Sequence, residues 1–388
     1  MINKTLAILR NLFFTALCLG LISCSEKTEK SEIKRENKIE KTLVKYAQGF
    51  DIQIHKDYKK LIIKAPYPEA ENQQEFILVT APNHDFKDPK RVRVPVKKMV
   101  ATSTTHIPMM ELLGAANSLV GFPNTDYISS EKTRQRIKNG EVTDLGNEQH
   151  FNTEVLISLQ PDVVIAFSMG KSSKMFNTIE QNGIPVIYNG DWLEATPLGR
   201  AEWIKFFGVL FGKEKEADSI FNEIELAYKA SKEIALQATS TPDVMSGVLY
   251  KDKWNLPAGE SFTAQLYKDA NTNYLWSESK GQGSLVLSFE AVYDRAAQAD
   301  LWIGSGYYTS LDALKNANSH YEQFSTFKTG EIYSFSKKRS ESGGVAYFEF
   351  APIQPHIVLK DLIKVAHPEL LPGYEPYFLQ RLERTPGD

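Results

Sequence analysis

The chain has 388 residues, is 42% hydrophobic and carries 45 basic against 48 acidic side chains. This length allows two domains of roughly 100 to 200 residues each, with enough core to fold without disulfide bonds. The near balance of charge, without a basic stripe interleaved with aromatic residues, argues against a nucleic-acid partner.

Residues 1–23 are typical of an export signal. Two basic residues precede an apolar run over 12–22, which is about half of the roughly 20 residues that a membrane-spanning helix needs. Ser23 before Cys24 fits a bacterial lipobox, which predicts that Cys24 is acylated; a plain secretory signal with a chance cysteine is the alternative. The only other cysteine, Cys18, lies in the removed segment, so the mature chain is predicted to contain no disulfide.

The next two segments differ in composition. Residues 24–45 are mostly charged or small and polar, with no aromatic residue before Tyr46, which predicts a disordered tether that links the lipid to the folded body. Residues 46–98 instead contain short β-type runs at 50–54, 60–64 and 75–79, separated by proline and asparagine. They predict a small antiparallel β element without a ligand role.

From residue 99 onward, β-type runs alternate with helical patterns, which predicts an α/β fold with parallel sheets. A first lobe is expected over 99–212, a connecting helix over 213–240 and a second lobe over 241–388. The helical stretch 197–238 is interrupted only near Gly208 and Gly212. The expected strands are 98–103, 162–167, 184–188, 244–250, 300–304 and 331–335, and the expected helices include 107–113, 262–269 and 353–365. Two Rossmann-like lobes joined by a single long rigid helix would enclose a cleft.

A weak internal repeat falls at equivalent places in the two lobes. The segments 151–165 and 287–303 each begin a short helix with a glutamate, Glu154 or Glu290, and continue through an aspartate into an apolar strand. Taken alone, each glutamate is explained by the helix dipole, which favours an exposed acidic side chain near the N-terminus by roughly 0.3 to 1 kcal/mol.

The order and spacing of these segments resemble a known family. The resemblance covers about 98–383 and rests on 104–114 with 119–122, the two repeat segments, 183–186, the helical stretch, 259–269 and 354–362. The chain resembles the helical-backbone binding proteins of ABC importers that carry ferric siderophores, heme or cobalamin. The resemblance implies a monomeric, non-enzymatic protein in the periplasm, with a lipid anchor favoured on the inner membrane although the outer membrane is possible. It also implies a permease with a cytoplasmic ATPase as partner, and permease arginines that dock on Glu154 and Glu290.

Ligand contacts are expected in loops at the carboxyl ends of the strands, where α/β sheets bind ligands. The candidates are Thr104, Thr105, His106, Ser168, Met169, Asn189, Asp191, Trp192, Lys251, Trp254, Tyr307 and Arg339, with Lys253, Ser305, Tyr308, Lys337 and Lys338 beside them. Aromatic rings and cations together suit a large planar or anionic ligand. Helix capping, solvated loops and ordinary packing are the alternatives for single residues.

Three other functions compete with this interpretation. Direct capture of zinc or manganese would use histidines, for which the candidates are His106, His150, His320 and His356, but they show no close pair at ligand spacing. An exported hydrolase would need a nucleophile, and Ser305 between two glycines lacks the spacing of a nucleophile elbow. No bound cofactor is expected, because phosphate-loop and dinucleotide fingerprints are absent. A surface lipoprotein that scavenges ligand without a permease is the third.

Overall fold

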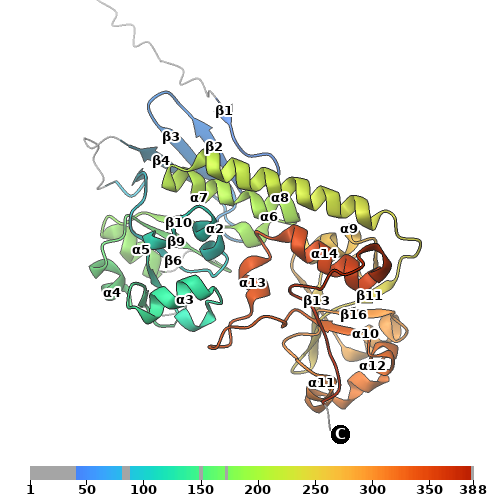
Figure 1. The fold of residues 1–388 in the computed structure, drawn as a ribbon. Coiled ribbons are helices and arrows are strands. Elements are labelled where there is room, and N and C mark those ends of the chain that lie inside the picture. The colour runs from blue at the N-terminus through green and yellow to red at the C-terminus, as the bar shows by residue number, and fades with distance from the viewer. Residues whose placement is uncertain (1–40, 81–87, 148–151, 171–173, 386–388) are drawn as a thin grey trace, which may run out of the picture. The chain divides into compact units, whose positions relative to one another are not determined.

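The computed structural model describes residues 41–80, 88–147, 152–170 and 174–385 (Figure 1). The predicted export signal, Cys24, the tether before residue 41 and His150 lie outside these residues. Within the part of the chain that the structure describes, no helix combines the length and the apolar character needed to cross a membrane.

A five-stranded sheet in the order β1–β2–β3–β4–β5 opens the described chain. Its strands are Lys41–Thr42, Phe50–Ile54, Lys59–Ile63, Gln74–Val79 and Arg91–Arg93. β1 to β4 pair antiparallel, and the three predicted strands correspond to β2, β3 and β4, whereas β5 joins β4 in parallel. Phe50 and Ile52 alternate onto the buried face, where the ring of Phe50 lies 4.5 Å from that of Trp203.

The folded chain begins before residue 46, which corrects the end of the predicted tether. β1 pairs with β2, and the backbone amides of Lys45, Tyr46 and Ala47 donate to the carboxylate of Glu202. Composition alone could not reveal this anchor, because the acceptor lies 155 to 157 residues further along the chain.

The first lobe contains a parallel sheet in the order β10–β9–β6–β7–β8. Its strands, from β6 to β10, are Met99–Ala101, Leu119–Phe122, Thr143–Asp144, Val163–Ala166 and Val186–Tyr188. The predicted strands at 98–103, 162–167 and 184–188 are confirmed with shorter bounds. The helices of this lobe are α2 (His106–Leu112), α3 (Glu131–Lys138), α4 (Thr153–Ser158) and α5 (Lys174–Gln181).

The expected long helical stretch is divided into α6 (Pro197–Glu202), α7 (Ile204–Phe211) and α8 (Glu214–Ala235). Gly212 ends α7 with a positive φ of 65°. The interruption predicted near Gly208 is wrong: this glycine lies inside α7, where a Cβ would be 2.6 Å from that of Ala217, so its small size allows α7 to pack closely on α8.

The connecting helix α8 contributes to two cores. Ala217, Phe221 and Ile224 in its first half join the core of the first lobe. Tyr228 and Ala235 in its second half join the core of the second lobe. The same helix packs on α7 and on α14 (Pro355–Ala366), which lies beside it (Figure 1).

The second lobe contains a mainly parallel sheet in the order β14–β11–β16–β17–β18. In chain order these strands, β11, β14, β16, β17 and β18, are Asp243–Met245, Asn273–Tyr274, Leu301–Ile303, Ile332–Ser334 and Gln380–Arg381. The helices are α9 (Phe262–Asp269), α10 (Phe289–Ala296), α11 (Leu311–Ala317), α12 (Ser325–Thr329), α13 (Ala346–Phe350) and α14. The predictions at 262–269, 300–304, 331–335 and 353–365 are confirmed within a few residues.

The single strand predicted over 244–250 is wrong. The chain leaves β11 at Ser246 and enters a separate antiparallel sheet, β12–β13–β15, formed by Val248–Tyr250, Lys253–Pro257 and Ser284–Leu287. The turn between the sheets is at Gly247, whose φ is 79°. A Cβ at Gly247 would lie 1.9 Å from the carbonyl oxygen of Asn255, so no larger residue fits.

Gly247→Ala is therefore expected to lower the free energy of unfolding by about 2–5 kcal/mol, combining left-handed strain with a backbone clash. Gly281→Ala is the matched control, because its φ is also positive, at 98°, but no atom lies within 4 Å of the added Cβ. We expect it to cost only about 1–2 kcal/mol. Urea unfolding of the chain from Ser25 measures both, and equal losses would contradict the close approach.

Residues 340–353, here called the crossing segment, belong to the second half of the chain but pack on the first lobe. Within it, α13 contacts α2, and Ile353 is part of the core of the first lobe. The Ser342 hydroxyl donates to the carbonyl of Asp126 at 2.6 Å. The lobes are therefore joined by this segment as well as by α8.

Candidate functional site

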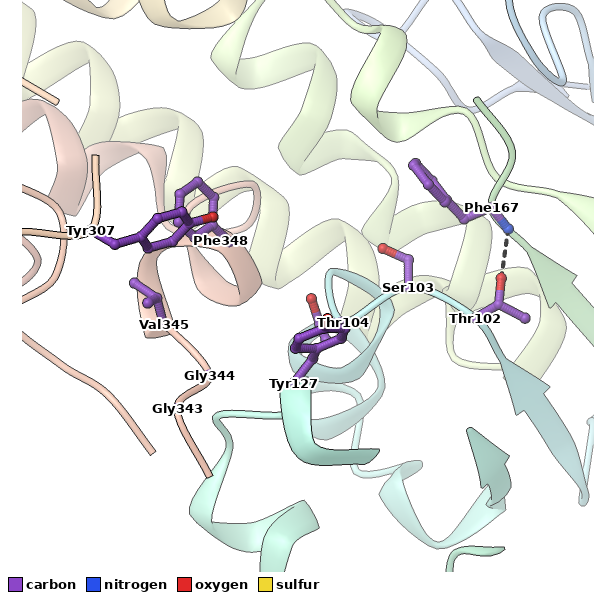
Figure 2. Close-up of a pocket in the computed structure, with 10 residues that line it drawn as sticks. All are labelled: Thr102, Ser103, Thr104, Tyr127, Phe167, Tyr307, Gly343, Gly344, Val345 and Phe348. Carbon is purple, nitrogen blue, oxygen red and sulfur yellow. Dashed lines mark hydrogen bonds between the residues drawn. The ribbon is translucent and has the colours of Figure 1, made fainter. Parts of the chain in front are cut away.

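The candidate ligand site lies where β6 and β9 end. A cavity of about 320 Å³ is lined by residues that follow these strands and by residues of the second half of the chain. They are Thr102, Ser103, Thr104, Tyr127, Phe167, Tyr307, Gly343, Gly344, Val345 and Phe348 (Figure 2). The amide of Phe167 donates to the Thr102 hydroxyl at 2.8 Å, which fixes the two strand ends to each other. We call this space the cleft cavity.

Aromatic rings dominate the walls of the cleft cavity. Tyr127 and Phe167 come from the first lobe, and Tyr307 and Phe348 face them from the second half of the chain (Figure 2). The Tyr307 and Phe348 rings lie 5.5 Å apart. Tyr127, Tyr307 and Phe348 are 54%, 63% and 49% exposed, which is unusual for rings of this size and leaves apolar area available to a ligand.

Part of the candidate set comes together here. Thr104 and Tyr307 line the cleft cavity. Thr105 lies beside it, with its hydroxyl 3.0 Å from that of Ser103. Arg339 donates to the carbonyl of Tyr307, which brings a guanidinium to the second-lobe wall. The neighbouring lysines are engaged elsewhere: Lys337 donates to a backbone carbonyl, and Lys338 lies over the ring of Tyr377.

Two candidates are corrected, because the structure places them in the core. His106 is fully buried at the start of α2, its ring 5.6 Å from Phe207, and burial lowers the pKa of its imidazole to about 3. Trp254 is also fully buried, packed in tilted and edge-on contacts with Trp302, Tyr321 and Phe324, and donates to the carbonyl of Ser246. Neither side chain reaches the cleft cavity.

The candidates after β10 form a buried polar corner. Asn189 and Asp191 are 0% and 1% exposed, and the Asn189 side chain accepts from the amide of Asp191. Burial raises the pKa of Asp191, and the nearby Thr105 hydroxyl and the charge of Arg200 oppose this shift. Trp192 is half-buried, its ring 5.7 Å from Phe167, and it lines a second hollow of about 300 Å³ with Arg200.

Three further candidates lie in loops and do not line the cleft cavity. Ser168 closes a local turn by donating to Gly170, and Met169 is 75% exposed. Lys251 occupies the turn between β12 and β13 with φ 57°, and its amine lies near the ring of Tyr250. Ser305 is buried and bonded to Tyr333, so its position between two glycines serves packing.

Sequence reasoning missed half of the aromatic wall. Tyr127 lies shortly after β7, a strand that was not predicted, although the rule that ligands bind at carboxyl ends would have reached it. Phe348 had no such signal, because it lies on a short helix far from any strand end. Gly344 was the local indication, since the absence of a side chain allows its backbone to approach the carbonyl oxygen of Tyr127.

The two docking candidates occupy equivalent positions. Asn152 caps α4 by accepting from Val155 at 3.0 Å, and Ser288 caps α10 by accepting from Ala291 at 3.3 Å. Glu154 and Glu290 follow two residues after these caps, and both are exposed. The backbone and Ser288 side-chain hydrogen bonds lower the pKa of Glu290, so it stays ionised. Both carboxylates are thus presented to solvent at helix starts.

The histidine candidates that the structure describes are dispersed. His106 is buried in α2, His320 is exposed against the ring of Phe289, and His356 lies on α14. Burial, with the charge of Lys360, lowers the pKa of His356 to about 4. Among the described residues, no group of three or more His, Cys, Asp or Glu side chains is placed to hold a metal ion.

Comparison with known proteins identifies the family. The model of the periplasmic binding protein family matches residues 99–338, which include the first-lobe sheet and strands β11 to β17 of the second lobe. The chain belongs to the periplasmic binding protein family. Members are substrate-binding transport proteins, and the α/β fold with parallel sheets agrees with this assignment.

Curated relatives of this binding protein come from Methanocaldococcus jannaschii. One, named an uncharacterised lipoprotein, is 25% identical over 298 residues, covering 74% of this chain and 69% of the relative. A second lipoprotein of that organism is 25% identical over 365 residues, covering 89% and 88%.

Solved structures share the fold. A periplasmic heme-binding protein from Pseudomonas aeruginosa aligns with a TM-score of 0.56 and 17% identity, over 75% of this binding protein and 99% of that chain. A possible iron-binding protein from Staphylococcus epidermidis aligns at 0.55 and 17%, over 70% and 99%. A structure titled as an Fe3+-hydroxamate transport system from Saccharomonospora viridis aligns at 0.53 and 14%, over 70% and 93%.

Proposed function

We propose that this binding protein is a lipid-anchored component of an ABC importer that captures an iron chelate, or a corrinoid or heme-type ligand, in the cleft cavity. It then delivers that ligand to a membrane permease with a cytoplasmic ATPase. The observation that carries the proposal is the wall of partly exposed rings, Tyr127, Tyr307 and Phe348, that faces threonine and serine hydroxyls. Rings supply flat apolar area and hydroxyls supply hydrogen bonds, which together suit a large ligand with polar edges.

The side chains of this wall favour a bound molecule whose own atoms already chelate the metal. Its polar groups are the hydroxyls of Thr102, Ser103 and Thr104 and the phenols of the tyrosines, while Arg339 lies at the edge. These groups recognise the outside of a chelate. Two solved structures with this fold are named as a heme-binding protein and as part of an Fe3+-hydroxamate transport system. These names support the same ligand class.

The location follows from the predicted lipobox. Acylation of Cys24 would hold the protein at a bacterial membrane, with the inner membrane favoured, and the lipoprotein names of the curated relatives support this anchor. Labelling of the full chain with a fatty-acid analogue tests it, and Cys24→Ala should abolish the label.

Ligand binding is tested by tryptophan fluorescence of the chain from Ser25, titrated with hemin, cobalamin, a ferric hydroxamate and a ferric catecholate. We expect saturable quenching by one of these probes at micromolar concentration or below. Trp192 is the expected reporter because its ring is 5.7 Å from Phe167 in the cleft wall, whereas Trp254 is buried in the second-lobe core.

The control is Trp192→Phe, which should lose most of the quenching while calorimetry still detects binding of the same probe. Phe348→Ala should weaken that binding by about tenfold or more, since removing the apolar area of a ring that the ligand would cover costs about 1.4 kcal/mol or more. If none of the four probes binds by calorimetry, the proposed ligand class is wrong.

A further inference from the structure

The crossing segment and the first lobe meet at a buried carboxylate. Glu349 in α13 is 1% exposed, and its two oxygens accept from the backbone amides of Ser129 and Ser130, the second at 3.1 Å. These amides lie at the start of α3, where helix N–H groups have no partner within the helix and favour an acceptor. The contact joins residues 219 and 220 positions apart.

A second carboxylate shares this junction. Glu111 of α2 accepts from the Ser130 and Thr133 hydroxyls at 2.6 Å each, so Ser130 is bonded to Glu111 through its side chain and to Glu349 through its backbone. The other ionisable side chains of these elements are Glu131, Lys132, Arg134, Arg136 and Lys138 on α3, His106 on α2 and Tyr347 on α13 itself. Arg134, Arg136 and Lys138 pair with Asp126, Glu141 and Glu341, and among the described residues no Lys or Arg forms a hydrogen bond or ion pair with Glu349.

The same segment forms one wall of the cleft cavity. Gly343, Gly344, Val345 and Phe348 precede Glu349 directly, and all four line the cavity. A Cβ at Gly344 would lie 2.5 Å from the carbonyl oxygen of Tyr127, so this backbone rests on the first-lobe wall. Any release of Glu349 from α3 would therefore move Phe348 relative to Tyr127 and change the width of the cavity.

We propose that Glu349 is a positioning residue of the ligand site, because its contact with the start of α3 fastens the crossing segment and sets the separation of the two cleft walls. The cleft cavity of about 320 Å³ lies within the roughly 300–1,000 Å³ typical of ligand pockets, and the fastened segment holds Phe348 opposite Tyr127 at this width. The role of Glu349 in ligand capture rests on the proposed function.

The contact should also depend on pH. Burial raises the pKa of Glu349 to about 8, with Glu111 adding to the rise and the Ser129 and Ser130 amides opposing it. A raised pKa means that the docked segment binds the proton more tightly than the released one. Docking is therefore strongest at acid pH and weakens as the pH rises through about 8.

The test measures lobe separation without ligand. The chain from Ser25 contains no cysteine, so cysteines introduced at the exposed positions Lys132 in α3 and Asn316 in α11 can be labelled specifically. Spin labels at these two positions report the distance between the lobes by pulsed electron paramagnetic resonance. At pH 6 the wild-type protein should give a narrow distribution that broadens at pH 9.5. Glu349→Ala should be broad at both values. Glu349→Gln should give the same distribution at both values, narrower than that of Glu349→Ala, because its one amide oxygen still accepts but the side chain does not titrate.

The matched control is Glu341→Gln, which removes an exposed ion pair with Lys138 at 3.4 Å in the same segment and should leave the distribution and its pH response unchanged. A distribution that is the same in Glu349→Ala as in the wild type, or that responds to pH in Glu349→Gln, overturns the proposal. Binding of the ligand probe at pH 6 should weaken at least tenfold in Glu349→Ala and recover in Glu349→Gln. Failure of every probe to bind would refute the proposed function, while the distances would still decide the role of Glu349 in fastening the segment.

Discussion

Glu202→Ala is expected to lower the free energy of unfolding by about 3–5 kcal/mol, because removing one partner of a buried charge network leaves the other partners uncompensated. The Glu202 carboxylate is fully buried and accepts from the amides of Lys45, Tyr46 and Ala47 at 2.8, 2.5 and 2.9 Å. It also pairs with the Lys205 amine at 3.0 Å. Alanine would leave three amides without an acceptor and release the segment that leads into the N-terminal sheet.

Two variants separate this network from a general effect of losing an acidic residue. Glu202→Gln keeps one acceptor oxygen and the side-chain shape, so we expect a smaller loss, of about 1–3 kcal/mol. Glu233→Ala removes an exposed carboxylate from α8 and should change stability by less than about 0.5 kcal/mol. Chemical unfolding measures all three, and a Glu202→Ala loss as small as that of Glu233→Ala would show that the network does not anchor the segment.

Buried carboxylates of this kind mark the limit of prediction from sequence. Glu194, Glu202, Glu349 and Asp361 each accept backbone amides, and for the first three the donors lie more than a hundred residues away. Nothing in the local pattern distinguishes them from the exposed acids around them. They fix how the N-terminal sheet and the crossing segment attach to the lobes, so these attachments were not predictable.

Elements set by local chemistry were predictable. The helix at 262–269 has the same bounds in the structure, because Ser261 caps it through the amide of Ala264 and an apolar face follows. The strand at 50–54 is reproduced for a similar reason, since its alternation matches one buried face. The run 244–250 failed because its apolar residues continue through Gly247, where a distant backbone, not the local pattern, forces the chain into another sheet.

The predicted site residues divide in the same way, into those placed by their position along the chain and those placed by distant packing. Thr104 and Tyr307 line the cleft cavity because they follow strands at the carboxyl edge of a sheet, and position along the chain is enough to place them there. His106 at the start of α2 and Trp254 inside β13 were proposed by the same rule, but both side chains are buried in the core, which depends on packing that the sequence does not display. Phe348 reaches the cleft cavity only through the crossing segment, so its role depends on contacts such as that of Glu349 with α3.

The Glu154→Ala, Glu290→Ala double variant is expected to lose transport while it keeps its affinity for the probe ligand. Both carboxylates are exposed two residues after equivalent helix caps, on α4 and α10, away from the residues that line the cleft cavity. A charge-assisted hydrogen bond contributes about 1.5–3 kcal/mol, so the loss of two permease contacts should weaken docking by about 3–6 kcal/mol. At 1.4 kcal/mol per factor of ten, uptake at limiting binding protein should fall at least about 100-fold.

Uptake of the probe ligand into proteoliposomes that contain the cognate permease and ATPase measures this effect, and calorimetry checks that ligand affinity is intact. The matched control is Glu131→Ala with Glu369→Ala, which removes two other exposed acids from the first turns of helices without touching the repeat. A general electrostatic attraction would weaken uptake equally in both double variants and vanish at high salt. A loss confined to Glu154 and Glu290 would instead assign the docking role to the repeated helix starts, and normal uptake in that variant would refute it.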